Sequence, residues 1–210
     1  MRKTLFSGIA ACLLATAATA AEQSPSVIWT VGQADRSASE FALAPDRFRD
    51  FLANDFGYED KYFLVGHSVP AADFPYVLPG PADTWGGTWP TSGWRTHQVN
   101  ILFGLKEIPS DGTCTLVVDL LDYAKNFLPL VKVSVNTQDA KFQLDAPGLC
   151  VADQRKPNQM EKIVDTLSIT GNLAKATPRR LEIPIRPGVL KAGGNEVTIT
   201  VLEGSWILFD

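Results

Sequence analysis

A proline- and glycine-rich stretch, residues 74–98, carries most of the side chains in this sequence that could do binding chemistry. It holds three of the five tryptophans of the chain, together with four prolines and four glycines. Aromatic rings have flat apolar faces and bring a large contact area with few rotatable bonds. The carboxylate, guanidinium and imidazole groups between them add hydrogen-bonding partners. This mixture suits a ligand that has apolar faces and a polar rim.

Sugar rings have this character, because their C–H faces are apolar and their hydroxyl groups lie around the edge. The candidate site residues are four rings and four polar partners: Tyr76, Trp85, Trp89 and Trp94, with Asp73, Asp83, Arg95 and His97. Proline stiffens such a stretch and lowers the cost of ordering it on binding. The planar fork of Arg95 matches a carboxylate, so an acidic sugar would find a partner there.

Core packing is the competing interpretation for the tryptophans of this stretch, because tryptophan is highly buried on average. Trp29 and Trp206 have apolar neighbours, and we interpret both as core residues. A second polar cluster has two interpretations as well, a local ion pair with a cap or the rim of the same sugar site. Its members are Asp35, Arg36 and Glu40.

The first twenty residues are expected to be removed from the mature protein. Arg2 and Lys3 form a basic start, residues 4–16 are apolar or small, and residues 18–20 read Ala-Thr-Ala, a cleavage signature. These features indicate a secretory signal peptide that is too short to span a membrane. A lipoprotein signal ending at Cys12 is the alternative. We expect a secreted or periplasmic protein without membrane insertion.

Residues 21–210 are expected to form a single domain, long enough to bury a core without a metal. The formal charge of the chain is −4, and it becomes −6 without Arg2 and Lys3, since 17 basic residues then face 23 acidic ones. This charge argues against nucleic acid and anionic membranes as partners. We expect no cofactor and no metal site with a chemical role, and the sequence leaves a structural calcium ion open.

Cys114 and Cys150 are the two cysteines that remain after cleavage. In an exported protein an even pair is first interpreted as a disulfide, which would stabilise the fold by about 3–4 kcal/mol in the chain-entropy model. Two separate buried thiols are the alternative. A catalytic cysteine or a zinc site is not expected, because the chain has only two histidines and no C-x-x-C pair.

Short segments rich in β-branched and aromatic residues predict an all-β protein. In residues 131–135 and 197–201 apolar and polar side chains alternate, which is typical of a half-solvated antiparallel sheet. The expected strands are residues 26–32, 61–66, 97–105, 113–122, 130–136, 162–171, 179–186, 195–204 and 205–210, with one short helix at 45–56. The pattern predicts an antiparallel β-sandwich of the jelly-roll, galactose-binding-like type.

Three segments together resemble the carbohydrate-binding-module-like C-terminal domain, domain III, of the rhamnogalacturonan lyases of polysaccharide lyase family 4. They read VIWTVGQADRSASEFAL, FPYVLPGPADTW and LKAGGNEVTITVLEGSWILFD, in that order along the chain. The resemblance covers nearly all of residues 21–210 and implies a jelly roll that recognises carbohydrate. The catalytic lysine and histidine of the family belong to a domain that this sequence does not contain, so the resemblance implies no catalytic residue here.

The leading hypothesis is an exported protein that binds plant cell-wall polysaccharide of the pectic, rhamnogalacturonan type and does not cleave it alone. One alternative is a small polysaccharide lyase or glycoside hydrolase. His97 or His67 with Arg95 could act in a lyase, although a lone histidine such as His67 is more often structural. A hydrolase needs two carboxylates, which some pair among 23 acidic residues would supply by chance. The other alternative is a non-catalytic module that docks on a separate catalytic protein.

Overall fold

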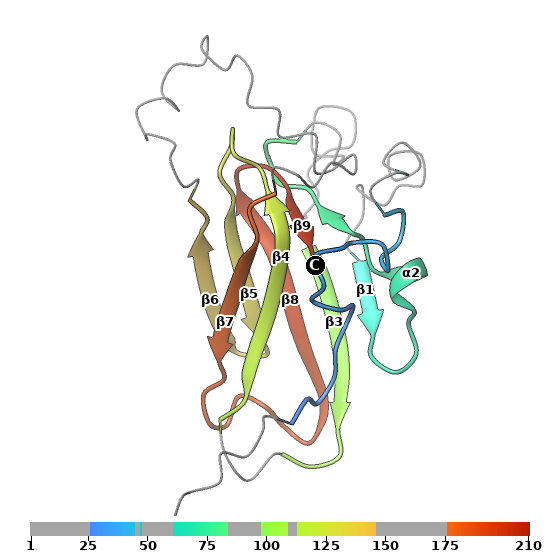
Figure 1. The fold of residues 1–210 in the computed structure, drawn as a ribbon. Helices are drawn as coiled ribbons and strands as arrows, with labels where there is room; N and C mark the ends of the chain where they lie inside the picture. The colour runs from blue at the N-terminus through green and yellow to red at the C-terminus, as the bar shows by residue number, and fades with distance from the viewer. Residues whose placement is uncertain (1–25, 45–46, 48–60, 84–97, 109–112, 146–175) are drawn as a thin grey trace, which may run out of the picture.

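The described part of the chain is a sandwich of two β-sheets around one apolar core (Figure 1). This computed structural model describes residues 26–44, 47, 61–83, 98–108, 113–145 and 176–210. The prediction of an all-β sandwich is therefore confirmed. The expected strand at 162–171, and all of the expected helix at 45–56 except residue 47, lie outside the described residues. No helix of the described part is long and apolar enough to cross a membrane.

One sheet has five strands in the order β1-β3-β8-β5-β6. Its members are β1 (Lys61–Leu64), β3 (Gln98–Leu105), β8 (Gly193–Glu203), β5 (Leu130–Val135) and β6 (Gln138–Gln143). Strand β1 runs parallel to β3, whereas all other neighbours in this sheet are antiparallel.

The second sheet has four strands in the order β2-β9-β4-β7. Its members are β2 (Val77–Leu78), β9 (Ile207–Phe209), β4 (Thr115–Tyr123) and β7 (Arg179–Pro184), all paired antiparallel. Strand β9 is short and pairs with β4 only between Leu120 and Tyr123. Among the described residues, the first half of β4 pairs with β7 alone.

Alternation along the strands decides which face of each sheet is buried. In β5 the side chains of Val131, Val133 and Val135 are buried, whereas Lys132 and Ser134 between them are half-buried on the opposite face. Strands β3 and β8 follow the same rule, so their valine and isoleucine side chains join the core. The half-solvated sheet that the sequence pattern predicts is present.

The structure also differs from the sequence prediction in three segments. Residues 26–32 form no strand, although their composition predicts one. Strand β6 was not predicted, because its sequence QDAKFQ is mostly polar; a two-residue turn after β5 places it, and Asn136 adopts a φ of +48° there. A short helix, α2 (Pro70–Asp73), lies just before the aromatic stretch.

The two tryptophans that we expected in the core occupy different positions. Trp206 is 3% exposed and lies in the tight connection between β8 and β9, so its assignment to the core is confirmed. Trp29 is only partly buried, with its ring centroid 5.1 Å from that of Phe103. It therefore packs at the border of the core, outside any strand.

Candidate functional site

The aromatic stretch is described at its two ends, residues 74–83 and Gln98. Five of the predicted site residues lie outside the described residues: Trp85, Trp89, Trp94, Arg95 and His97. Asp73, Tyr76 and Asp83 are described, and all three take part in holding the fold.

Tyr76 is a core residue in this structure. Its side chain has no exposed surface, and its backbone carbonyl accepts a hydrogen bond from the N–H of Phe209 at 2.9 Å. The chain enters the four-stranded sheet here, since Val77 pairs with Leu208 directly afterwards. A ring without exposed surface cannot stack on a sugar, so the structure places Tyr76 outside any ligand platform.

Asp83 anchors residues 80–83 to the rest of the fold. Its carboxylate is buried and accepts hydrogen bonds from the N–H of Gly80, at 2.8 Å, and from the hydroxyl of Ser205. The N–H of Ala82 also donates to the carbonyl of Gly204 at 2.8 Å. These bonds tie residues 80–83 to the connection between β8 and β9, and they give Asp83 a structural role.

Asp73 is the last residue of the short helix α2, and its side chain caps the start of that helix. Its Oδ2 accepts a hydrogen bond from the N–H of Val69, the residue before the helix, at 2.7 Å. This contact satisfies one of the N–H groups that a helix start leaves without a partner. Asp73 is half-buried, and this bond gives it a structural role, as the contacts of Asp83 do.

The second polar cluster is also part of the local structure. Oε1 of Glu40 accepts a hydrogen bond from the N–H of Gln33 at 2.8 Å, and the N–H of Arg36 donates to Oδ1 of Asp210 at 2.7 Å. His67 is exposed, and its N–H donates to the carbonyl of Leu64 in the turn after β1. These contacts hold the backbone, and the one from Arg36 is long-range; neither of the two bonds in the cluster is the local ion pair of the simpler interpretation.

Cys114 lies immediately before β4, its side chain is half-buried, and it forms no disulfide with another described residue. Its carbonyl accepts a hydrogen bond from the N–H of Ile185 at 2.8 Å, which extends the pairing with β7. The expected partner, Cys150, lies outside the described residues. The disulfide remains a prediction.

The outer side of the five-stranded sheet provides a polar surface that the sequence analysis did not combine into a site. Register places one side chain from each strand in a single row: Tyr62, Asn100, Thr198, Ser134 and Asp139. A neighbouring row consists of Gln98, Thr200, Lys132 and Lys141. We call these nine residues the polar face. With strands about 4.8 Å apart, each row extends across most of the sheet.

Asn100 forms hydrogen bonds with neighbouring residues of the polar face and with strand β1. It is 2% exposed, and its Oδ1 accepts hydrogen bonds from Thr198 Oγ1 at 3.0 Å and from Gln98 Nε2 at 3.5 Å. Its Nδ2 donates to the carbonyl of Lys61 at 3.5 Å. Three strands are thereby joined through one side chain, so the groups around it have fixed positions.

Charge and aromatic surface lie at opposite edges of the polar face. Lys132 Nζ lies 3.3 Å from Asp139 Oδ2, and hydrogen bonds from Ser134 and then from Lys132 lower the pKa of the Asp139 carboxyl. Lys141 is exposed beside them on β6. On β1 the ring of Tyr62 is 62% exposed. The face therefore combines an exposed ring, fixed hydrogen-bonding groups and cations.

The described part of the chain is thus a β-sandwich whose five-stranded sheet has a partly exposed polar face. Residues 27–210 match the family described as CBM-like, polysaccharide lyase family 4, domain III. The chain belongs to this family, which confirms the resemblance seen in its sequence. No curated protein matches the chain.

The sequence predicted several residues of the polar face individually, but it did not predict that they lie together. Alternation in the expected strands already put Lys132, Ser134, Thr198 and Thr200 on a solvated side. The order of the strands in the sheet, however, could not be derived from that pattern. Tyr62 was missed for this reason, because β1 joins the sheet through a parallel pair with β3.

Proposed function

We propose that this chain is an exported protein that binds acidic plant cell-wall polysaccharide of the pectic, rhamnogalacturonan type. The observation that carries the proposal is the row across all five strands of a member of this family, from the exposed ring of Tyr62 to Asp139. Tyr62 offers a stacking surface, and the half-buried hydroxyl groups of Thr198 and Ser134 follow it in the row, while the buried Asn100 holds Thr198 in place. Lys132 and Lys141 supply the cations that a uronate would need.

The aromatic stretch extends the proposed site. Its last residue, Gln98, is the first residue of β3 and stands on the polar face next to Thr200. Trp85, Trp89 and Trp94 lie between Asp83 and this position in the sequence. In this proposal they add stacking surface at the Gln98 end of the face, and Arg95 adds a partner for a carboxylate.

Calorimetric titration of the mature chain with rhamnogalacturonan, homogalacturonan and a neutral glucan tests the proposal. Tyr62→Ala should weaken binding to rhamnogalacturonan about tenfold, or about 1.4 kcal/mol, because an exposed ring adds stability only in the complex. Phe127→Ala is the matched control, since Phe127 is 49% exposed in the connection between β4 and β5. It should bind as the wild type does.

Trp85→Ala and Trp89→Ala should each weaken binding by about 1–3 kcal/mol with little change in Tm. A large loss of stability in both would assign these tryptophans to the core instead. Absence of binding to all three glycans would contradict the proposed function. In that case a module that docks on a separate catalytic protein would account better for the fold.

Export is the second half of the proposal and has its own measurement. Amino-terminal sequencing of the protein recovered outside the cytoplasm should begin at Ala21, after the Ala-Thr-Ala signature. A lipid-modified amino terminus at Cys12 would show the lipoprotein alternative. A full-length chain that stays in the cytoplasm would exclude both forms of export.

A further inference from the structure

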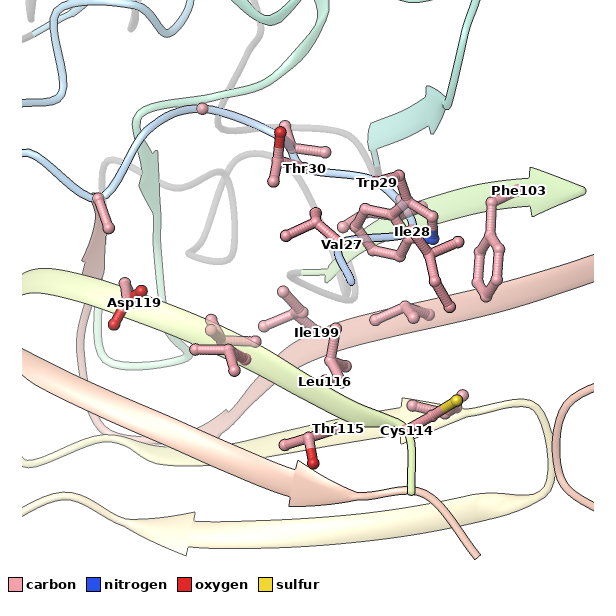
Figure 2. A pocket seen from close by; sticks show the side chains of 18 of the residues that line it. Val27, Ile28, Trp29, Thr30, Phe103, Cys114, Thr115, Leu116, Asp119 and Ile199 are labelled. Atoms are coloured by element: carbon pink, nitrogen blue, oxygen red, sulfur yellow. The ribbon is translucent and has the colours of Figure 1, made fainter. Parts of the chain in front are cut away.

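A hollow of about 580 Å³ lies on the outer side of the five-stranded sheet, where β3 ends and β8 begins. This volume is in the range of ligand sites in proteins, about 300–1,000 Å³. The side chain of Phe103 on β3 points to the opposite side of the sheet, into a cavity of about 820 Å³ that Trp29 also lines (Figure 2). We call the outer cavity the glycine hollow, and the residues that line it include Leu64, Leu102, Gly104, Gly194, Lys191 and Glu196.

Two glycines directly opposite each other form the floor of the glycine hollow. Gly104 on β3 pairs with Gly194 on β8, and both are exposed. Neither has the positive φ that favours glycine, and a Cβ at either position would have no atom of the described chain within 4 Å. Backbone conformation and crowding by the described residues therefore do not require glycine here. Glycine weakens a strand and often marks the close approach of a ligand.

Two leucines form an apolar wall next to this floor. Leu64 on β1 pairs with Leu102 on β3. Their side chains lie on the outer side of the sheet, since Phe63 and Ile101 beside them are buried in the core. Leu64 is 44% exposed and follows Tyr62 by two residues on the same side of β1, about 7 Å along the strand. The glycine hollow is therefore continuous with the polar face.

The glycine hollow carries no net charge, because one ammonium group and one carboxylate line it, those of Lys191 and Glu196. At the opposite corner of the polar face, two ammonium groups, those of Lys132 and Lys141, face the single carboxylate of Asp139. A negatively charged sugar is therefore favoured over β5 and β6, and a neutral sugar is favoured over the hollow.

Two asparagines hold the side of the hollow that lies at the turn after β5. Nδ2 of Asn136 donates a hydrogen bond to Oδ1 of Asn195 at 2.8 Å, and Oδ1 of Asn136 accepts one from the N–H of Glu196 at 3.0 Å. The N–H of Lys191 also donates to Oδ1 of Asn195, at 3.0 Å. The backbone at Lys191 and Glu196 is thus fixed before a ligand binds, which lowers the ordering cost of binding.

We propose that the glycine hollow is a second sugar subsite, which binds the neutral 6-deoxy sugar of a polysaccharide whose uronate lies over Lys132 and Lys141. The inference rests on the proposed function, because rhamnogalacturonan alternates rhamnose, a 6-deoxy sugar, with galacturonate. One face of the rhamnose ring lies on the glycine floor, and its C6 methyl group contacts Leu64 and Leu102. The polysaccharide then crosses the sheet diagonally, from β1 and β3 toward β6.

The leucine wall discriminates against a sugar with a hydroxyl group at C6. A methyl group that contacts Leu64 and Leu102 is removed from water, which is favourable. A hydroxyl group at the same position would lose hydrogen bonds with water and find no partner on either leucine. A galacturonate would bring its carboxylate close to that of Glu196. The hollow therefore favours the deoxy sugar, and the two glycines let its ring approach the backbone closely.

The first two probes are monosaccharides that differ only at C6, methyl α-L-rhamnoside and methyl α-L-mannoside, titrated into the isotope-labelled mature chain. We expect the rhamnoside to shift the amide signals of Gly104 and Gly194. The mannoside should bind about fivefold to tenfold more weakly, because its hydroxyl group is left without a partner. A third probe, oligogalacturonate with acetyl esters, offers a methyl group from another source and should leave the signals of the two glycines unchanged.

Gly104→Thr tests the floor of the hollow. Its affinity for the rhamnoside should fall about tenfold, because the added atoms occupy the position of the sugar ring. Its Tm should equal or exceed that of the wild type, since threonine suits a strand better than glycine. Leu64→Ala removes part of the wall and should weaken rhamnoside binding about fivefold. Val117→Ala is the matched control: Val117 is 42% exposed on β4 of the other sheet, and this variant should bind as the wild type does.

Several results would overturn the subsite. One is equal affinity for the two glycosides, and another is a rhamnoside that leaves the signals of Gly104 and Gly194 unchanged. Shifts of these signals with the acetyl ester and not with the rhamnoside would assign the hollow to an ester methyl group instead.

Binding of rhamnogalacturonan separates the subsite from the proposed function. Binding that Tyr62→Ala weakens and Gly104→Thr does not would overturn the subsite and leave the proposed function standing. Should Gly104→Thr fail to fold, Leu64→Ala takes its place in this comparison. Absence of binding of both rhamnogalacturonan and oligogalacturonate to the wild type would overturn both proposals.

Discussion

The backbone N–H of Arg36 donates a hydrogen bond to Oδ1 of Asp210 at 2.7 Å, although the two residues are 174 positions apart. The N–H of Ser37 reaches the same oxygen at 3.2 Å. Arg36 has a φ of +67°, a conformation that few residues other than glycine adopt without cost. The last side chain of the chain thus fixes the turn that follows residues 26–32.

Replacing Asp210 should separate its hydrogen bonds from its charge. Asp210→Ala removes the acceptor and should lower the free energy of unfolding by about 1 kcal/mol. Asp210→Asn keeps an acceptor oxygen and should stay within about 0.5 kcal/mol of the wild type near neutral pH. Thermal unfolding of both variants measures the difference, and an equal loss in the two would contradict a role as acceptor.

The same pair predicts a dependence on pH. Burial raises the pKa of the Asp210 carboxyl above its usual value. The backbone N–H groups of Arg36 and Ser37 lower this pKa, and the nearby carboxylates of Asp119 and Asp35 raise it further, so the net change is upward. A carboxyl with a raised pKa stabilises the fold at low pH, and this contribution is lost as the pH rises through its folded pKa. The Tm of Asp210→Asn relative to the wild type should therefore increase between about pH 3 and pH 6. A constant difference over this range would be the contrary result.

Replacing Asp83 should lower the free energy of unfolding, because its carboxylate has a structural role. Asp83→Ala leaves the hydroxyl of Ser205 and the N–H of Gly80 without their buried partner, at a cost of about 2–3 kcal/mol. Ser205→Ala removes one of the two contacts and should cost less. Chemical unfolding gives both values. If the Asp83→Ala variant unfolded like the wild type but lost glycan affinity, Asp83 would be a sugar-binding residue, as the sequence predicted.

The disulfide can be tested on the exported protein. Cys114 and Cys150 should be bonded after removal of the signal peptide, so thiol titration under denaturing conditions should detect no free thiol before reduction and two after it. The bond would join the start of β4 to a position in the chain between β6 and β7. Detecting two free thiols without reductant would establish the alternative of separate thiols.

Cleavage of pectic polysaccharide is not expected from this chain alone. β-Elimination needs a positioned base and a group that neutralises the uronate, held together on rigid elements. Of the two histidines, His67 is exposed in the turn after β1. Ultraviolet absorbance of unsaturated uronate should stay constant over hours with pectic substrates and added calcium. A steady rise that disappears in His97→Ala, with the fold intact, would make the chain a lyase.

The sequence by itself determined the class of fold and the family. Alternation of valine with polar residues in 131–135 and 197–201 could be read without any long-range information, because a strand exposes every second side chain. The structure confirms the alternation in β5 and β8, and the family match covers the segments in which the resemblance was first seen. Composition alone gave a wrong prediction for residues 26–32, which are rich in β-formers but pair with no strand in the described part of the chain.

Only the tertiary structure decided which polar and aromatic residues are available to a ligand. Tyr76 and Tyr62 have the same side chain, yet one is fully buried and the other is 62% exposed. Burial depends on contacts with distant parts of the chain: the N–H of Phe209 donates to the carbonyl of Tyr76, and the hydroxyl of Ser205 donates to Asp83 from 122 positions away. The polar face arises in the same way, because it is set by the order of neighbouring strands, which local sequence preferences do not specify.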